Sequence, residues 1–173
     1  MINYVEKYHH HIYYSLVLLC FGLFVIQRID NLDFKIGNAY PVLLVPAVVV
    51  ISCFLREWCG FITGLVCGIA LDTVTNGTQY FNTLTLMILG AAVGLTFSFF
   101  LNRNIKAVII VSVLVSIIFF LLKWIFLDLF TGDPSAVDLL LRYHLPSAFY
   151  TSLFAIPFFY FIRWLCKKNL VEQ

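Results

Sequence analysis

The chain carries very little charge. Only 12% of its 173 residues are Asp, Glu, Lys or Arg, whereas about 25% is usual in a soluble domain. Hydrophobic residues make up 62% of the chain. A water-soluble fold of this size exposes too much surface to hide so many apolar side chains. The composition therefore excludes a soluble domain and predicts a fold surrounded by lipid.

Sequence motifs for catalysis are missing as well. The chain has no HExxH, GxSxG, Walker or GxGxxG pattern, and Asp138, His144 and Ser147 fit no arrangement of nucleophile, base and orienting group. The five cysteines form no CxxC pair and read as small buried apolar residues. No basic block of the kind that binds nucleic acid is present. We therefore expect no catalytic residue, no metal, no other cofactor and no nucleic-acid partner.

What the chain does have is a series of long apolar runs. A transmembrane helix needs about 20 apolar residues, with a range of about 17–25. Six stretches reach or approach that length: Ile12–Gln27, Tyr40–Leu55, Trp58–Asp72, Tyr80–Leu101, Ala107–Leu127 and Pro146–Leu165. The second and third are short, so a re-entrant pair is the alternative for them. We expect an all-α integral membrane protein in which residues 1–173 form one transmembrane domain, a bundle of six helices.

The distribution of Lys and Arg predicts the orientation of this bundle, because positively charged loops stay in the cytoplasm. With the N-terminus inside, seven basic residues fall on the cytoplasmic side and four on the outer side. The inner set is Lys7, Arg56, Arg103, Lys106, Arg163, Lys167 and Lys168, and the outer set is Arg28, Lys35, Lys123 and Arg142. Both termini are therefore expected in the cytoplasm.

Glycines recur every fourth residue in the third apolar run, at Gly60, Gly64 and Gly68. Residues at this spacing lie on one helix face, and small residues let two membrane helices approach closely. The stripe predicts either a contact inside the bundle or a groove for a partner's transmembrane helix. Gly90 and Gly94 in the fourth run follow the same logic and are candidates for the opposing face.

Asp72 ends the glycine stripe. A charge in or near the membrane is costly and is usually paired or functional. Lys123 is the only Lys well inside an apolar run, and the expected topology places both residues near the outer membrane face. Two interpretations stay open: Asp72 caps the following Thr73–Gly77 segment at the interface, or it forms an intramembrane ion pair with Lys123.

The segment from Arg56 to Asp72, together with Gly77 and the stretch from Asn82 to Gly94, resembles the rod shape-determining protein MreD family. That family has a G-x-x-x-G-L-x-x-G helix ending in Asp, a Gly in the next loop and a glycine-containing fourth helix. Leu141–Thr151 is also similar to the start of the family's last helix. On this resemblance Gly64, Gly68, Asp72, Gly90, Gly94 and Pro146 are the matching positions, without a defined chemical role for any of them.

The resemblance implies a non-catalytic scaffold in the bacterial cytoplasmic membrane. Its implied partners are an MreC-like membrane protein and the complex of a RodA-type glycosyltransferase with a penicillin-binding protein. MreB filaments would be linked indirectly, and membrane lipids would surround the bundle.

A second family has a similar outline, the substrate-binding S component of energy-coupling factor vitamin transporters. Those proteins carry an Ala-x-x-x-Ala stripe on the first helix, where Ser15–Phe24 of this chain has bulky residues. A ligand pocket would have to come from Gln79, Asn82 and Asp128 at the outer rim. This transporter subunit is the alternative to the scaffold.

Overall fold

The computed structural model describes residues 22, 41–55, 57–74, 80–102, 104–129 and 136–171. Apart from short turns and connections, these residues are helical. The elements are α2 (Leu44–Leu55), α3 (Glu57–Val74), α4 (Phe81–Phe99), α5 (Ile105–Lys123), the π-helical turn η2 (Trp124–Leu129), α6 (Ala136–Leu139), the π-helical turn η3 (Leu140–His144), α7 (Leu145–Leu153) and α8 (Ala155–Val171). The first predicted span, Ile12–Gln27, lies outside the described residues apart from Gly22.

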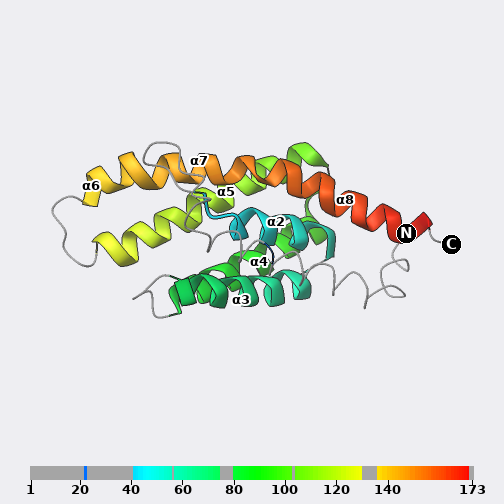
Figure 1. The fold of residues 1–173 in the computed structure, drawn as a ribbon, viewed down its shortest axis with the longest axis horizontal. Helices are drawn as coiled ribbons and strands as arrows, with labels where there is room; N and C mark the ends of the chain where they lie inside the picture. The colour runs from blue at the N-terminus through cyan, green and yellow to red at the C-terminus, as the bar shows by residue number, and fades with distance from the viewer. Residues whose placement is uncertain are drawn as a thin grey trace.

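The long helices run along the long axis of the molecule (Figure 1). Consecutive helices α3 and α4 form an antiparallel hairpin, and α5 and the continuous α6–α8 stretch form a second layer. We call the end of the bundle that holds Asp72 and Tyr80 the Asp72 end. The opposite end, which holds Glu57 and Ser98, is the Glu57 end.

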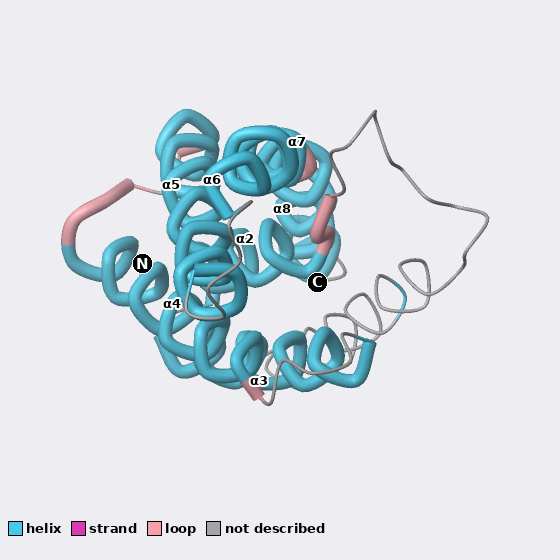
Figure 2. Tube along the Cα trace, turned by 90° about the vertical axis from the view of Figure 1, so that its left-hand side faces the viewer, coloured by secondary structure: helices cyan, strands magenta, loops and turns pink. Residues whose placement is uncertain are grey.

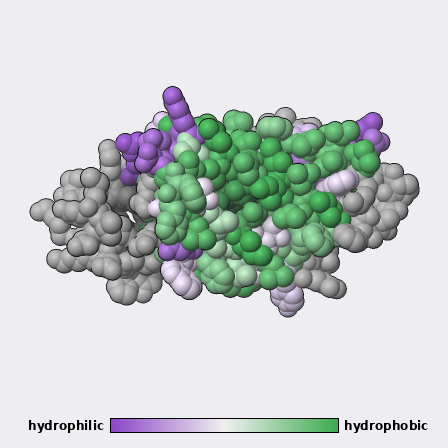
Figure 3. All heavy atoms as spheres, turned by 180° about the vertical axis from the view of Figure 1, so that it is seen from behind, coloured by the Kyte–Doolittle hydropathy of each residue, from purple (hydrophilic) through white to green (hydrophobic). Residues whose placement is uncertain are grey.

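Three helical stretches in the described part of the chain are long and apolar enough to cross a membrane. They are Phe81–Phe99, Ile105–Leu127 and Val137–Trp164. Large apolar side chains on their outward faces are exposed, among them Ile88, Ile110 and Phe149. On the face drawn in Figure 3, apolar residues cover the middle and hydrophilic residues gather toward the ends. Exposed apolar side chains on helices of this length favour a protein embedded in a membrane.

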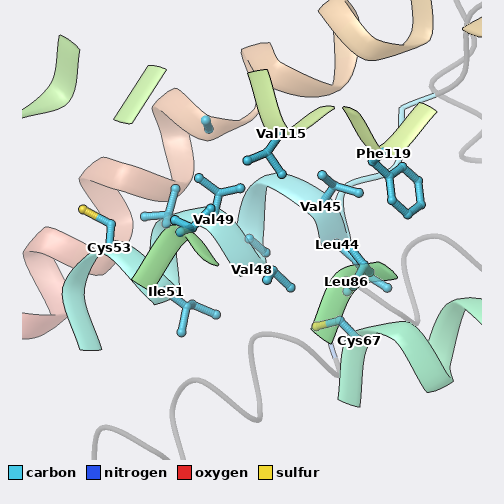
Figure 4. Packing of buried hydrophobic residues seen from close by; sticks show 14 of the residues in the cluster. Leu44, Val45, Val48, Val49, Ile51, Cys53, Cys67, Leu86, Val115 and Phe119 are labelled. Carbon is cyan, nitrogen blue, oxygen red and sulfur yellow. The ribbon is translucent and has the colours of Figure 1, made fainter. Parts of the chain in front are cut away.

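Helix α2 occupies the centre of the bundle, between the α3–α4 hairpin and the layer of α5, α7 and α8 (Figure 2). Its side chains are buried on all sides, as in a helix that is apolar all round. Figure 4 shows Val45 and Val49 facing Val115 of α5, while Leu44 lies near Leu86 of α4. The protein core is therefore built around α2.

Helix α2 is also too short to span the bilayer by itself. Its 12 residues cover about 18 Å at about 1.5 Å per residue, against a hydrocarbon core of about 30 Å. The helix starts at Leu44, whereas the apolar run predicted a span from Tyr40. Pro46 lies in its first turn, where a backbone N–H would lack a helical partner, so the proline fits without breaking the helix.

The last predicted connection is shorter than the sequence suggested. The predicted spans Ala107–Leu127 and Pro146–Leu165 leave residues 128–144 between them as a polar linker, but helix continues to Leu129 and resumes at Ala136. The predicted loop boundaries were therefore wrong. Asp138 and Arg142 lie within this helical stretch, so polar residues here do not interrupt the helix. Part of each extension has the wider π-helical turn.

Candidate functional site: the glycine-packed hairpin and its Asp72 cap

The three glycines of α3 lie against the backbone of α4. A Cβ added at Gly60, Gly64 or Gly68 would come within 3.0 Å of backbone atoms of Gly90, Leu86 or Thr83, respectively. Successive glycines therefore meet successive turns of α4, as expected for two antiparallel helices in close contact. Backbone atoms cannot move aside as a flexible side chain can, so this face of α3 admits no side chain without separating the helices.

Gly60 and Gly90 face each other across this interface. A Cβ on Gly90 would overlap the carbonyl oxygen of Gly60, and a Cβ on Gly60 would overlap that of Gly90. Helix α2 reaches the same point, because Ser52 Oγ lies 2.5 Å from the position of a Gly60 Cβ and Val48 Cγ1 lies 3.0 Å from that of Gly90. Gly94 is buried one turn further along α4. The glycines thus allow α2, α3 and α4 to converge.

Asp72 binds the first turn of α4. Its Oδ1 accepts hydrogen bonds from the backbone N–H of Asn82 (3.2 Å) and from Asn82 Nδ2 (2.9 Å). Its Oδ2 accepts from the backbone N–H of Thr83 (2.9 Å) and from Thr83 Oγ1 (2.5 Å). A carboxylate at a helix N-terminus satisfies free N–H groups and interacts favourably with the helix dipole. Asp72 is therefore an N-terminal cap of α4 supplied by the neighbouring helix.

Helix α4 has no side-chain cap of its own. The residue at its N-cap position, Tyr80, makes no side-chain hydrogen bond to the helix. The N–H groups of Asn82 and Thr83 occupy the second and third helical positions, which an N-cap side chain would normally serve. Gly68 makes the substitute cap reachable, since it lies against Thr83 and brings α3 close to α4 one turn before Asp72.

The other end of the hairpin is held by a second contact. Ser98 Oγ donates a hydrogen bond of 3.0 Å to Glu57 Oε2, joining the first residue of α3 to the last turn of α4. This contact is exposed and contributes less than a buried one. The glycine stripe holds α3 against α4 in the middle of the hairpin, and Asp72 holds them together at the far end.

The start of α2 depends on another buried hydroxyl group. The backbone N–H of Val42 donates a hydrogen bond of 3.1 Å to Oγ1 of Thr151, whose side chain is fully buried. Thr151 lies near the middle of the Val137–Trp164 stretch, so this contact is deep within the bundle. Where water is excluded, an unpaired N–H is costly, and Ser or Thr side chains satisfy such groups. Thr151 thereby fixes the buried end of α2.

Lys123 lies in the last turn of α5, at the same end of the bundle as Asp72. The ring centroids of Phe81 and Phe126 are 5.6 Å apart. The start of α4 therefore lies next to the π-helical turn η2, which follows Lys123. The ion pair between Asp72 and Lys123 stays a prediction. Asp72 caps α4, ten and eleven residues further along the chain. The alternative in which it caps Thr73–Gly77 falls largely outside the described residues, since these include only Thr73 and Val74 of that segment.

Within the described residues, no group of three or more His, Cys, Asp or Glu side chains is placed to hold a metal ion. Asn82, which the transporter alternative assigns to a ligand pocket, is 1% exposed and bonds to Asp72. The site is thus a packing and capping arrangement. Its chemistry is that of hydrogen-bond acceptance and close helix contact.

Sequence reasoning singled out the five glycines and Asp72 but missed Thr83, Ser98 and Thr151. Each of these partners is a small hydroxyl residue within an apolar run, and such residues carry little information on their own. One signal was available for Thr83: Tyr80 is a poor N-cap residue, which suggests that the cap comes from elsewhere.

Comparison with protein families gives a match over most of the chain. The family model described as rod shape-determining protein MreD matches residues 9–169 of the 173-residue chain. No curated protein and no solved structure matches significantly.

Proposed function

Because the chain belongs to the MreD family and so to the proteins of rod shape determination, we propose that it is a non-catalytic membrane scaffold of the bacterial cell-elongation machinery. In this proposal it binds an MreC-like membrane protein in the cytoplasmic membrane. Through that complex it links MreB filaments indirectly to a RodA-type glycosyltransferase and its penicillin-binding protein. The family match over nearly the whole chain is the observation that carries the proposal.

The structure of the α3–α4 hairpin supports a scaffold role. A scaffold must hold its partner-binding surface in a constant shape, and this hairpin is fixed by close backbone contact and by hydrogen bonds at both ends. We propose that the inward glycine face organises the bundle, and that the rim around Asp72 contacts the partner. The glycine stripe and the Asp72 end of the same helix then have different tasks.

We also propose that the Glu57 end faces the cytoplasm. Lys106 and Arg163 are exposed toward this end, and the basic tail residues Lys167 and Lys168 follow in α8. Excess positive charge at one end favours the cytoplasmic side. The Asp72 end then faces outward, where an extracytoplasmic domain of a partner is accessible.

Copurification tests this function. The tagged chain is expected to bring down an MreC-like protein from membranes, and Gly64→Leu is expected to reduce that complex and to disturb rod shape. Ile62→Leu is the matched control, since Ile62 is 55% exposed on the outward face of the same helix. Normal complex formation and normal rods with Gly64→Leu would contradict the proposal. Recovery of an ATPase module or a bound vitamin would instead support the transporter alternative.

A further inference from the structure

Tyr80 has an unusual backbone conformation. Its φ is 65° and its ψ is 10°, in the left-handed region, and no other non-glycine residue in the described part of the chain has a positive φ. In this region the Cβ of an L-residue crowds the following carbonyl oxygen, which makes a bulky side chain unfavourable. A glycine would adopt the same backbone conformation without that cost.

The surrounding structure imposes this conformation. Asp72 accepts hydrogen bonds from the N–H groups of Asn82 and Thr83, two and three residues after Tyr80. The carbonyl of Tyr80 accepts a hydrogen bond of 3.0 Å from the N–H of Leu84. All of these interactions involve the backbone around Tyr80. None of them requires its side chain.

The side chain itself points away from the bundle. It is 72% exposed and makes no capping hydrogen bond. A glycine at this position would thus preserve the contacts described above and remove the backbone strain. Strained residues persist where the surrounding structure imposes them, and they concentrate at functional sites. Since no contact described here uses the tyrosine ring, we look for its role outside the bundle.

The position of Tyr80 along the membrane span indicates what its side chain contacts outside the bundle. It directly precedes the span Phe81–Phe99, whose 19 residues cover about 29 Å, close to the thickness of the hydrocarbon core of about 30 Å. Tyr80 therefore lies at the boundary between hydrocarbon and headgroups. Tyrosine suits this boundary, because its ring is apolar and its hydroxyl is polar. Phe126 is exposed at the same end.

We propose that Tyr80 is a membrane-interface anchor that contacts lipid directly. Its ring packs among the upper parts of the acyl chains and its hydroxyl bonds to glycerol-ester or phosphate oxygens. Because Asp72 holds the adjacent backbone, the anchor fixes the depth of the α3–α4 hairpin in the bilayer. This inference does not depend on the proposed scaffold function.

Photocrosslinking identifies which molecule contacts the side chain at position 80. Tyr80 is replaced by the photoreactive aromatic residue benzoylphenylalanine, and the full-length protein is irradiated in vesicles of phosphatidylethanolamine and phosphatidylglycerol and in native membranes. Lipid adducts detected by intact mass are expected in both. Leu84, one turn further and 55% exposed, is the positive control, and the buried Thr85 is the negative control. No adduct at position 80 despite one at 84, or a protein adduct in place of lipid in native membranes, would overturn the proposal.

A stability measurement tests the premise that the bundle does not need the tyrosine ring. Tyr80→Gly is expected to raise the midpoint of thermal unfolding in detergent, because it removes the backbone strain and leaves the Asp72 contacts intact. A midpoint lowered by more than the chain entropy of glycine accounts for would show that the ring contributes to the fold, and would refute the assignment of Tyr80 to the lipid interface.

Discussion

The capping of α4 by Asp72 leads to a quantitative prediction. Asp72→Ala removes the acceptor of four hydrogen bonds at once. The hydroxyl of Thr83 is partly exposed and can turn toward another partner, whereas the side chain of Asn82 is buried. The backbone N–H groups of both residues cannot turn, because the helix fixes their direction. The loss is therefore dominated by two unsatisfied N–H groups at the start of a helix.

The size of this loss follows from the type of bond. Replacing an N-cap side chain by Ala costs typically about 1 kcal/mol, and hydrogen bonds to charged groups are worth about 1.5–3 kcal/mol each. Partial access of headgroup water lowers the sum, since Asp72 is only partly buried. We expect Asp72→Ala to lower the free energy of unfolding by about 2–4 kcal/mol.

Asp72→Asn removes the negative charge but keeps one hydrogen-bond acceptor. Its amide oxygen still accepts from one backbone N–H, but its NH2 group then faces the other N–H, and donors do not bond to each other. We expect a loss of about 1–2 kcal/mol, roughly half that of the Ala variant. Thr73→Ala is the control, because Thr73 is exposed and its hydroxyl bonds only to the carbonyl of Ala70, so the change should stay within about 0.5 kcal/mol.

The assay is the free energy of unfolding in bicelles, measured by steric trapping, with the same labelling sites in all variants. The expected order of stability is wild type and Thr73→Ala, then Asp72→Asn, then Asp72→Ala. If Asp72→Ala were as stable as the Thr73→Ala control, the carboxylate would not be the cap of α4 and the reasoning would be refuted.

Three further variants test other contacts. Gly64→Ala is expected to lower the free energy of unfolding by more than about 1 kcal/mol, because its Cβ overlaps the backbone at Leu86; wild-type stability would show that the helices can separate freely. Thr151→Val should lower the free energy of unfolding by about 1–3 kcal/mol, because it leaves the buried N–H of Val42 unpaired. Thr151→Ser should restore most of this loss. Equal losses in the two variants would show that the hydroxyl does not stabilise the fold through this contact. If Asp72 pairs with Lys123, reversing both charges should recover stability lost by either single reversal, and a double variant no better than the singles would end that hypothesis.

The amino-acid sequence by itself determined the class of fold and the residues of closest helix contact. Apolar runs define helices because lipid offers no partner for backbone N–H and C=O groups, so each run must satisfy its own. Gly60, Gly64 and Gly68 were recognisable because a helix places every fourth residue on nearly the same face. Both signals are local in the chain, which is why they can be read without a structure.

Only the tertiary structure decided what those residues contact. Whether the glycine stripe met α4 or a partner, and whether Asp72 acted within its own helix or on another, depended on how the helices pack. The same holds for the central place of α2, which is set by the helices packed around it, and for the contact of Val42 with the hydroxyl of Thr151. Small polar groups within apolar runs gain their roles from neighbours distant in the chain, and the distance between such neighbours is set by three-dimensional packing alone.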